Sequence, residues 1–241
     1  MTEVSAMLGM REACCGRNAM ATIIGTNRND LVLFDTAVSA TRFDDWISTG
    51  NGNDTISGWD GNDTVFAGNG NDLITIDSGS DHFETGNGND TINANAGNQT
   101  IIAGNGDDLI SGGFGADALY GGNGADVFAF GVVIFGSQYR LDTGVGEGER
   151  DVIWDFKSGK DIIDLALVAG ETNLTFIGTA EFTGSGVATP ELRYYIDGDR
   201  TIIQMDGPMR QTGEGGPPDA LVDGEIELVG RFDLRAENFI L

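Results

Sequence analysis

A nine-residue period between Thr49 and Ala129 is the feature that most limits how this chain can fold. Each block has Gly two residues before a key polar position and an apolar residue two residues after it. That key position is held by Asp54, Asp63, Asp72, Asp81, Asp90, Gln99, Asp108, Asp117 and Asp126. One apolar residue per block cannot form a core alone, so the period predicts a β-solenoid in which coils stack on their neighbours.

The same spacing predicts a cation site in each turn. Gly lets a turn adopt backbone angles that a Cβ would forbid, so carbonyl oxygens can converge on one point. The Asp then adds a carboxylate, and Ca²⁺ takes about six to eight such oxygen ligands. We expect each block to form a turn of about six residues and a strand of about three, with one inward apolar side chain.

This stretch resembles the Gly-Gly-x-Gly-x-Asp-x-apolar-x nonapeptide repeats of the RTX family of secreted proteins. The resemblance implies an all-β fold, a right-handed parallel β-roll, with a calcium ion between stacked turns. Residues 151–165 are similar to the element that follows the repeats in this family. The later segments resemble the C-terminal domain of serralysin-type secreted proteases, which implies a β-sandwich-like region after the roll, with the protease domain absent.

Two blocks should make one coil, so alternate turns lie on the same side and define two faces. The regular face has both glycines and the Asp in every turn, and its predicted calcium ligands are Gly50, Gly52, Asp54, Gly68, Gly70, Asp72, Gly86, Gly88, Asp90, Gly104, Gly106, Asp108, Gly122, Gly124 and Asp126. The second face has turns that end at Asp63, Asp81, Gln99 and Asp117, and three of them lack the leading Gly. We expect about four ions on the regular face and fewer on the second face, with weaker binding near Gln99.

The resemblance divides the chain into four parts. Residues 1–19 are expected to be a flexible extension, residues 20–48 the N-terminal cap, residues 49–130 the calcium-binding roll, and residues 131–241 a C-terminal β domain that ends in a type I secretion signal. Asp151, Asp155, Asp161 and Asp164 in that last part could bind a closing calcium ion, and they could equally be turn caps.

Charge distribution indicates why metal is needed. The net charge is −25 and the pI is about 4.1, which argues against nucleic acid and anionic membranes as partners. No Lys or Arg occurs between Arg42 and Arg140, so the carboxylates of the roll repel one another without calcium. We expect the roll to be unfolded in a chelator. The alternative is a metal-free solenoid with Asn/Asp ladders. No apolar run is long enough for a transmembrane segment.

The sequence shows no catalytic motif. His82 is the one histidine, it should point outward, and no zinc-binding or nucleophile motif accompanies it. We expect a non-enzymatic secreted protein for adhesion, matrix or host contact, with calcium and the type I secretion apparatus as partners. The alternative is an accessory or carbohydrate-binding module of a secreted protease, glycanase or epimerase. Such a module should line up aromatic or basic residues on one sheet, whereas the positions beside the apolar slot are mostly small and polar: Thr55, Ser57, Thr64, Leu73, Thr75, Thr91 and Asn93.

Overall fold

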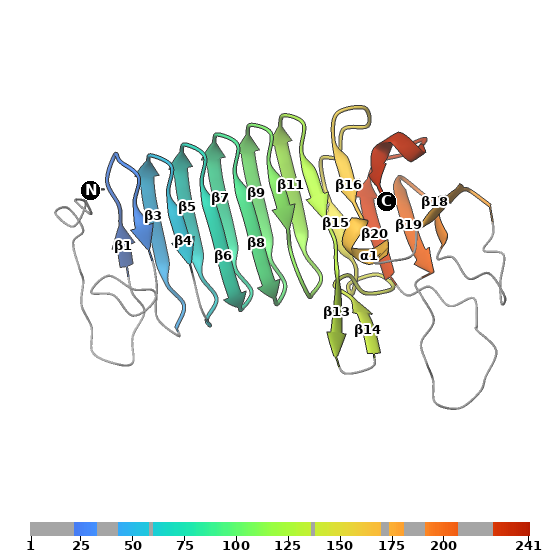
Figure 1. The fold of residues 1–241 in the computed structure, drawn as a ribbon, viewed down its shortest axis with the longest axis horizontal. Helices are drawn as coiled ribbons and strands as arrows, with labels where there is room; N and C mark the ends of the chain where they lie inside the picture. The colour runs from blue at the N-terminus through green and yellow to red at the C-terminus, as the bar shows by residue number, and fades with distance from the viewer. Residues whose placement is uncertain are drawn as a thin grey trace.

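Two long β-sheets face each other along the whole molecule in the computed structural model (Figure 1). The structure describes residues 22–32, 43–57, 60–135, 138–169, 174–180, 191–206 and 224–241. The expected extension 1–19, part of the expected N-terminal cap and most of the segment between residues 206 and 223 lie outside these ranges.

The first sheet, sheet A, has eleven strands and carries one half of every coil. In spatial order they are β1 (Thr22–Ile24), β3 (Trp46–Asn51), β5 (Thr64–Asn69), β7 (His82–Asn87), β9 (Thr100–Asn105), β11 (Ala118–Asn123), β15 (Asp151–Ile153), β20 (Gly224–Val229), β19 (Arg200–Asp206), β18 (Glu191–Asp197) and β17 (Thr175–Gly178).

Sheet B has eight strands and carries the other half. In order they are β2 (Leu31–Val32), β4 (Thr55–Ser57), β6 (Leu73–Ser78), β8 (Thr91–Ala96), β10 (Leu109–Ser111), β12 (Val127–Ala129), β16 (Ile162–Asp164) and β21 (Phe239–Ile240). A hairpin of β13 (Val132–Phe135) and β14 (Gln138–Leu141) interrupts the series, and the described helices are the short α1 (Ala166–Ala169) and η1 (Ala236–Asn238). No described helix has the length and apolar character needed to span a bilayer.

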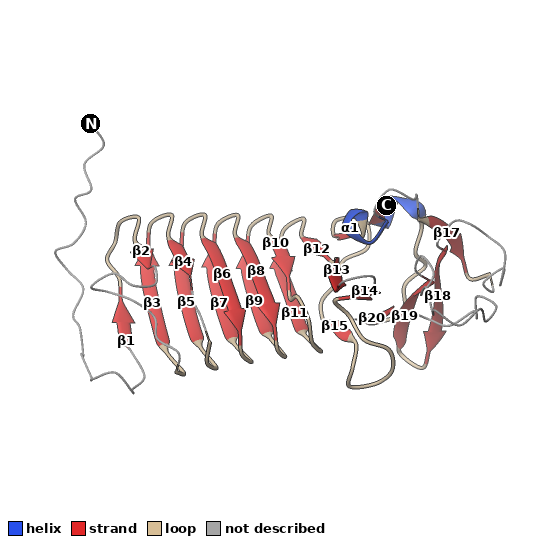
Figure 2. Ribbon diagram, turned by 60° about the horizontal axis from the view of Figure 1, so that its bottom comes forward, coloured by secondary structure: helices blue, strands red, loops and turns tan. Residues whose placement is uncertain are grey.

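The coil of two blocks is confirmed by the strand register. Val65 pairs with Ile47 in the coil before it and with Phe83 in the coil after it, all in parallel strands. The prediction of an all-β parallel β-roll is therefore confirmed, and Figure 2 shows its strands stacked side by side from β1 to β12.

The strands of sheet A are longer than the sequence predicts. Strands β3, β5, β7, β9 and β11 each run for six residues because pairing continues into the turn, where Gly50 pairs with Gly68 and Asn51 with Asn69. Expecting strands of about three residues was therefore wrong for these five strands and for β6 and β8 of sheet B, which also run for six residues. The leading Gly of each regular turn belongs to a strand as well as to the turn.

The core between the sheets is a double column of single apolar side chains. Sheet A contributes Ile47, Val65, Phe83, Ile101, Leu119 and Ile153, and sheet B contributes Ile56, Ile74, Ile92, Ile110, Phe128 and Ile163. All of them are buried. Small residues such as Ala67, Ala103 and Ala94 fill the inward positions two residues later in their strands. This column stabilises the stack, but it is only one large side chain wide.

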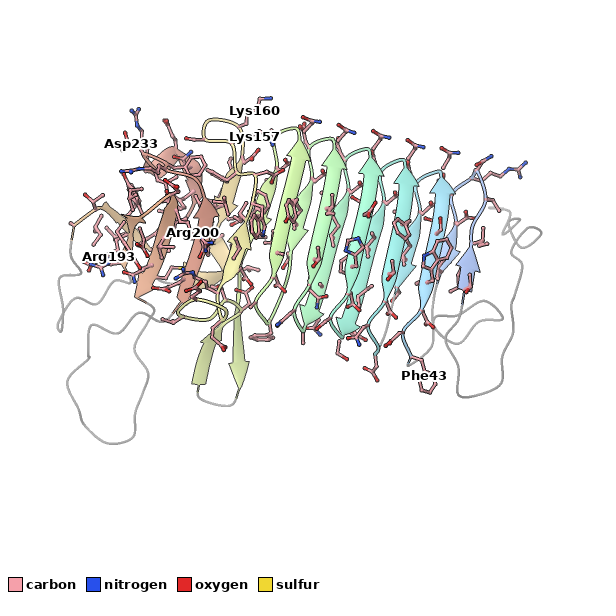
Figure 3. All side chains as sticks on the ribbon, turned by 180° about the vertical axis from the view of Figure 1, so that it is seen from behind. Phe43, Lys157, Lys160, Arg193, Arg200 and Asp233 are labelled. Atoms are coloured by element: carbon pink, nitrogen blue, oxygen red, sulfur yellow. The ribbon has the colours of Figure 1, made fainter. Side chains whose placement is uncertain are left out.

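The C-terminal strands extend the two sheets of the roll. Strand β15 pairs in parallel with β11 and β20, and β18, β19 and β20 then form an antiparallel set. The buried guanidinium of Arg150 joins this set through Glu227, with Nη2 2.6 Å from Oε2, and through Glu225, with Nη1 3.1 Å from Oε2. Figure 3 places Arg193 and Arg200 among the C-terminal strands, and Lys157 and Lys160 where these strands meet the roll.

Candidate metal sites in the turns

A continuous ladder of aspartates runs along the regular face. The backbone N–H of each Asp donates to Oδ1 of the Asp one coil further on, and the N···O distance is 2.8 Å for Asp54 to Asp72 and for Asp72 to Asp90. The same contact joins Asp90 to Asp108 at 2.8 Å and Asp108 to Asp126 at 3.1 Å. Each side chain is therefore fixed to the coil before it by one carboxylate oxygen.

The other carboxylate oxygen of each of these residues has no partner. Oδ2 of all five regular-face aspartates is buried and makes no hydrogen bond, and the same holds for Asp63, Asp81 and Asp117 on the second face. Buried polar atoms in native proteins are nearly always satisfied, so eight such atoms in two rows call for a ligand. Burial raises the pKa of Asp72 to about 6 and that of Asp108 to about 7 in the absence of metal.

The turn glycines bring carbonyl oxygens close to the next coil. The carbonyl oxygen of Gly52 lies 1.8 Å from where a Cβ on Gly70 would be, and that of Gly50 lies 1.9 Å from where a Cβ on Gly68 would be. Gly70 also has a φ of +130°, which L side chains rarely adopt. Carboxylate and carbonyl oxygens are thus stacked coil by coil, which is the donor set that Ca²⁺ prefers.

The exposed Asn residues of the regular turns form a separate ladder that needs no metal. Asn69 Nδ2 donates to Asn51 Oδ1 at 2.6 Å, and Asn87 Nδ2 donates to Asn69 Oδ1 at 2.6 Å. An amide has both a donor and an acceptor, so these side chains satisfy one another. The carboxylates have no donor, and this difference separates the Asp ladder from the metal-free alternative.

The second face has the same ladder with one chemical change. Asp45, Asp63 and Asp81 follow the rule, since Asp45 N donates to Asp63 Oδ1 at 2.8 Å and Asp63 N to Asp81 Oδ1 at 2.7 Å. Gln99 then accepts the Asp81 N–H on Oε1 at 2.8 Å, and its Nε2 donates to the Gly79 carbonyl oxygen at 2.9 Å. Beyond it, Asp117 Oδ1 accepts the Gln99 N–H at 2.7 Å.

Asp151 and Asp155, two of the four closing candidates, lie at turns of different faces. Asp151 continues the second face, where its Oδ1 accepts the Asp117 N–H at 2.7 Å. Asp155 instead caps the last regular turn, because its carboxylate accepts the N–H groups of Gly121 at 2.9 Å and Gly122 at 2.8 Å. The structure therefore does not bring these two residues together in one turn.

Of the other two closing candidates, Asp164 accepts the Ala166 N–H at 2.9 Å and Asp161 extends the regular face, beside two residues, Lys157 and Asp142, that the sequence analysis did not name. Asp161 is the next residue, or rung, of the ladder on the regular face, because its Oδ1 lies 3.2 Å from the Asp126 nitrogen. The ammonium group of Lys157 contacts the Gly122 carbonyl oxygen. Asp142 is buried, and its Oδ1 has no partner. Lys157 and Asp142 follow the end of the nine-residue period, so no spacing pointed to their places.

The outward side of sheet A carries aromatic residues that the sequence analysis passed over. Trp46 contacts Phe66 with ring centroids 5.7 Å apart, and Tyr120 stacks on Trp154 at 5.9 Å with an interplanar angle of 7°. His82 lies in the same region, outward as expected, and its Nε2 is 3.1 Å from Glu84 Oε1. The expectation of mostly small outward side chains fits sheet B better than sheet A.

Comparisons with known proteins agree with the repeat. Residues 39–74, 75–98 and 94–128 match the family profile described as RTX calcium-binding nonapeptide repeat, in four copies. No curated protein matches the chain. None of these findings supports the expected likeness of the C-terminal region to serralysins.

The solved structures similar to this chain include two subunits of the mannuronan C5-epimerase of Azotobacter vinelandii. The AlgE6R2 subunit has 22% identity and a TM-score of 0.37, and the match covers 83% of this chain and 88% of that one. The AlgE6R3 subunit has 21% identity and a TM-score of 0.33, with 89% and 80% covered. At these scores the likeness carries no inference about what this chain binds.

Proposed function

Because residues 39–128 carry RTX calcium-binding nonapeptide repeats, we propose that this chain is a secreted, non-enzymatic protein whose roll folds when it binds extracellular Ca²⁺. The observation that carries the proposal is the double row of buried Asp Oδ2 atoms without a hydrogen-bond partner. A divalent cation beside each such atom would supply the missing partner and offset the repulsion between successive carboxylates.

The donor set favours calcium over other metals. Among the described residues, the aspartate positions of the two rows present carboxylate and carbonyl oxygens, whereas zinc and copper prefer nitrogen or sulfur ligands. No group of three or more His, Cys, Asp and Glu side chains in the described residues could hold an ion by itself. Each ion would therefore be shared between stacked turns, with glycine carbonyls as part of its shell.

Sharing of ions between coils links metal binding to folding. The ligands of one site come from turns 18 residues apart, and these turns meet only when the coils stack. An unfolded chain has no such site, so the free energy of binding stabilises the folded roll. Millimolar calcium is found outside cells, which is the reason to propose secretion, through a type I apparatus that exports the unfolded chain.

The proposal is tested on the purified chain after exhaustive dialysis against EGTA. Calcium is then added while far-ultraviolet circular dichroism records β structure and calorimetry records bound ions. We expect a coil-like spectrum at the start and a gain of β signal as calcium binds. An unchanged spectrum together with no heat of binding would contradict the proposal.

We also propose that the regular face binds more calcium than the second face, with about four ions on the regular face. Every regular turn from Asp54 to Asp126 keeps both glycines, whereas the second face loses its leading Gly in three turns and a carboxylate at Gln99. A crystal structure with calcium, refined with anomalous data, measures this difference. Equal occupancy on the two faces would overturn it.

A carbohydrate-binding role is a second candidate, and the outward side of sheet A favours it. Trp46 and Trp154 are 38% and 43% exposed, and each packs beside a further aromatic ring on a neighbouring strand. Flat rows of exposed aromatic side chains on a rigid sheet mark an interaction surface. The roll has no Lys or Arg, so this surface suits a neutral glycan better than an anionic one.

Affinity electrophoresis through a gel that contains a neutral β-glucan tests this second role. In calcium, Trp154→Ala should lose retardation, whereas Thr75→Ala on the outward side of sheet B should keep it. Equal mobility of the wild type with and without the glucan would contradict a carbohydrate-binding role for the exposed aromatic residues. The calcium-binding proposal would be unaffected.

A further inference from the structure

We propose that the side-chain amide of Gln99 takes the place of a calcium ion between two stacked turns of the second face. This metal-free contact divides the calcium sites of that face into two separate groups. This inference rests on the proposed binding of calcium by the roll. It concerns a single rung, the contact between the turn that ends at Asp81 and the turn that ends at Gln99.

The amide of Gln99 makes two hydrogen bonds to the coil before it. Oε1 accepts the Asp81 N–H at 2.8 Å, which is the contact that Oδ1 of an aspartate makes at the other rungs. Nε2 donates to the Gly79 carbonyl oxygen at 2.9 Å. Gln99 is 2% exposed, so both contacts are sheltered from water.

At the aspartate rungs the second contact is missing. Of the nine residues in this position between 49 and 129, the eight aspartates each leave a buried Oδ2 without a partner, and Gln99 leaves no side-chain atom in that state. Exchange of a carboxylate oxygen for an NH₂ group thus turns an acceptor that needs a cation into a donor that needs a carbonyl.

The carbonyl that Gln99 uses is placed like the others in the roll. The Gly79 oxygen lies 1.7 Å from where a Cβ on Gly97 would be, and the Gly70 oxygen lies 1.9 Å from where a Cβ on Gly88 would be. The turns of both faces thus present a glycine carbonyl oxygen in the same position. What differs is the group that meets it, and at Gln99 that group is a protein N–H.

The contact between the turns of Asp81 and Gln99 does not provide a binding site for a cation. The NH₂ group is partly positive, it already holds the carbonyl oxygen, and the rung has lost one negative charge. Calcium sites of the second face are therefore confined to the rungs before it, Asp63 and Asp81, and the rungs after it, Asp117 and Asp151. The middle of the roll keeps one link between coils that does not depend on the calcium concentration.

The count of bound calcium in substituted chains tests the inference. Gln99→Asp restores the residue of the other eight blocks, and Gln99→Glu keeps the length of the side chain while the NH₂ group becomes an oxygen. Asn98→Asp is the matched control, because it adds the same charge at an exposed neighbour and keeps the Oδ1 that accepts the Ala116 N–H. Bound calcium is measured by equilibrium dialysis with radiocalcium at saturation.

We expect Gln99→Asp to bind about one more ion per chain than the wild type, and Asn98→Asp to bind the same number. An unchanged count in Gln99→Asp, with calcium bound by the wild type, overturns this inference alone. Absence of calcium binding by the wild type overturns the proposed function as well.

Hydrogen exchange of the wild type gives a second test that needs no variant. As free calcium is lowered, the Asp81 amide, which donates to Gln99, should stay protected to a lower concentration than the Asp72 amide, which donates to Asp90. Loss of protection of both amides at the same calcium concentration contradicts a metal-free link.

Discussion

Gly70→Ala tests the close approach of consecutive regular turns. A Cβ at residue 70 would lie 1.8 Å from the carbonyl oxygen of Gly52, whereas an unstrained contact needs roughly 3.5 Å. The residue also has a φ of +130°, where only glycine is unstrained. The coils would have to separate locally, and the first bonds to lengthen are Gly52 N to Asn69 O at 2.8 Å and Asp54 N to Asp72 Oδ1 at 2.8 Å.

The expected cost follows from these two effects. The left-handed backbone with a Cβ costs about 1–2 kcal/mol. Weakening of two hydrogen bonds between coils costs about 1 kcal/mol each. We therefore expect the free energy of unfolding in saturating calcium to fall by about 3–4 kcal/mol.

Urea unfolding in saturating calcium, followed by far-ultraviolet circular dichroism, measures this loss. Gly198→Ala is the matched control, because Gly198 has a φ of +58° but no atom within 4 Å of its added Cβ. It should cost only the backbone part, about 1–2 kcal/mol. Equal losses in the two variants would refute the claim that the stacked turns leave no room for a side chain.

Three further predictions concern the charged groups. Asp90→Asn, measured by calcium titration, should raise the free calcium needed for half-folding by about tenfold, because a buried carboxylate ligand is lost. Burial raises the pKa of Asp63 and Asp108 from the usual 3.8 to about 7 in the calcium-free fold. The metal-free fold then binds more protons than the unfolded chain between those values, so its stability falls as pH rises through this window. Far-ultraviolet circular dichroism of the calcium-free chain should therefore show more β structure at about pH 5 than at about pH 8. Lys157→Met should lower the urea stability by about 1–2 kcal/mol through loss of the carbonyl contact, whereas exposed Lys160→Met should change it by less than about 0.5 kcal/mol.

Much of the roll could be predicted because its constraints repeat. Gly and Asp at fixed offsets determine which residues turn, and the single apolar position determines which side chains face inward, as the burial of Val65 and Phe83 shows. Because the same spacing recurs in nine blocks, an error in reading one block does not change the predicted fold. The prediction of which aspartates share a face follows directly from the coil length.

What could not be predicted lies where the period gives no constraint. Gln99 looked like the loss of a ligand, and only the structure shows that its amide reaches the Gly79 carbonyl. Phe66 and Tyr120 occupy outward positions, whose side chains the core does not restrict. Asp161 becomes a rung after a long insertion, so its partner Asp126 lies 35 residues away in the sequence.

The most direct measurement of the central claim is the compactness of the wild-type chain with and without calcium, by small-angle X-ray scattering. After removal of calcium with EGTA, the chain should have the large radius of gyration of an expanded coil, and addition of millimolar calcium should bring it to the elongated two-sheet particle of Figure 1. A particle that keeps the dimensions of the roll in EGTA and still unfolds cooperatively would contradict the claim that calcium drives the fold.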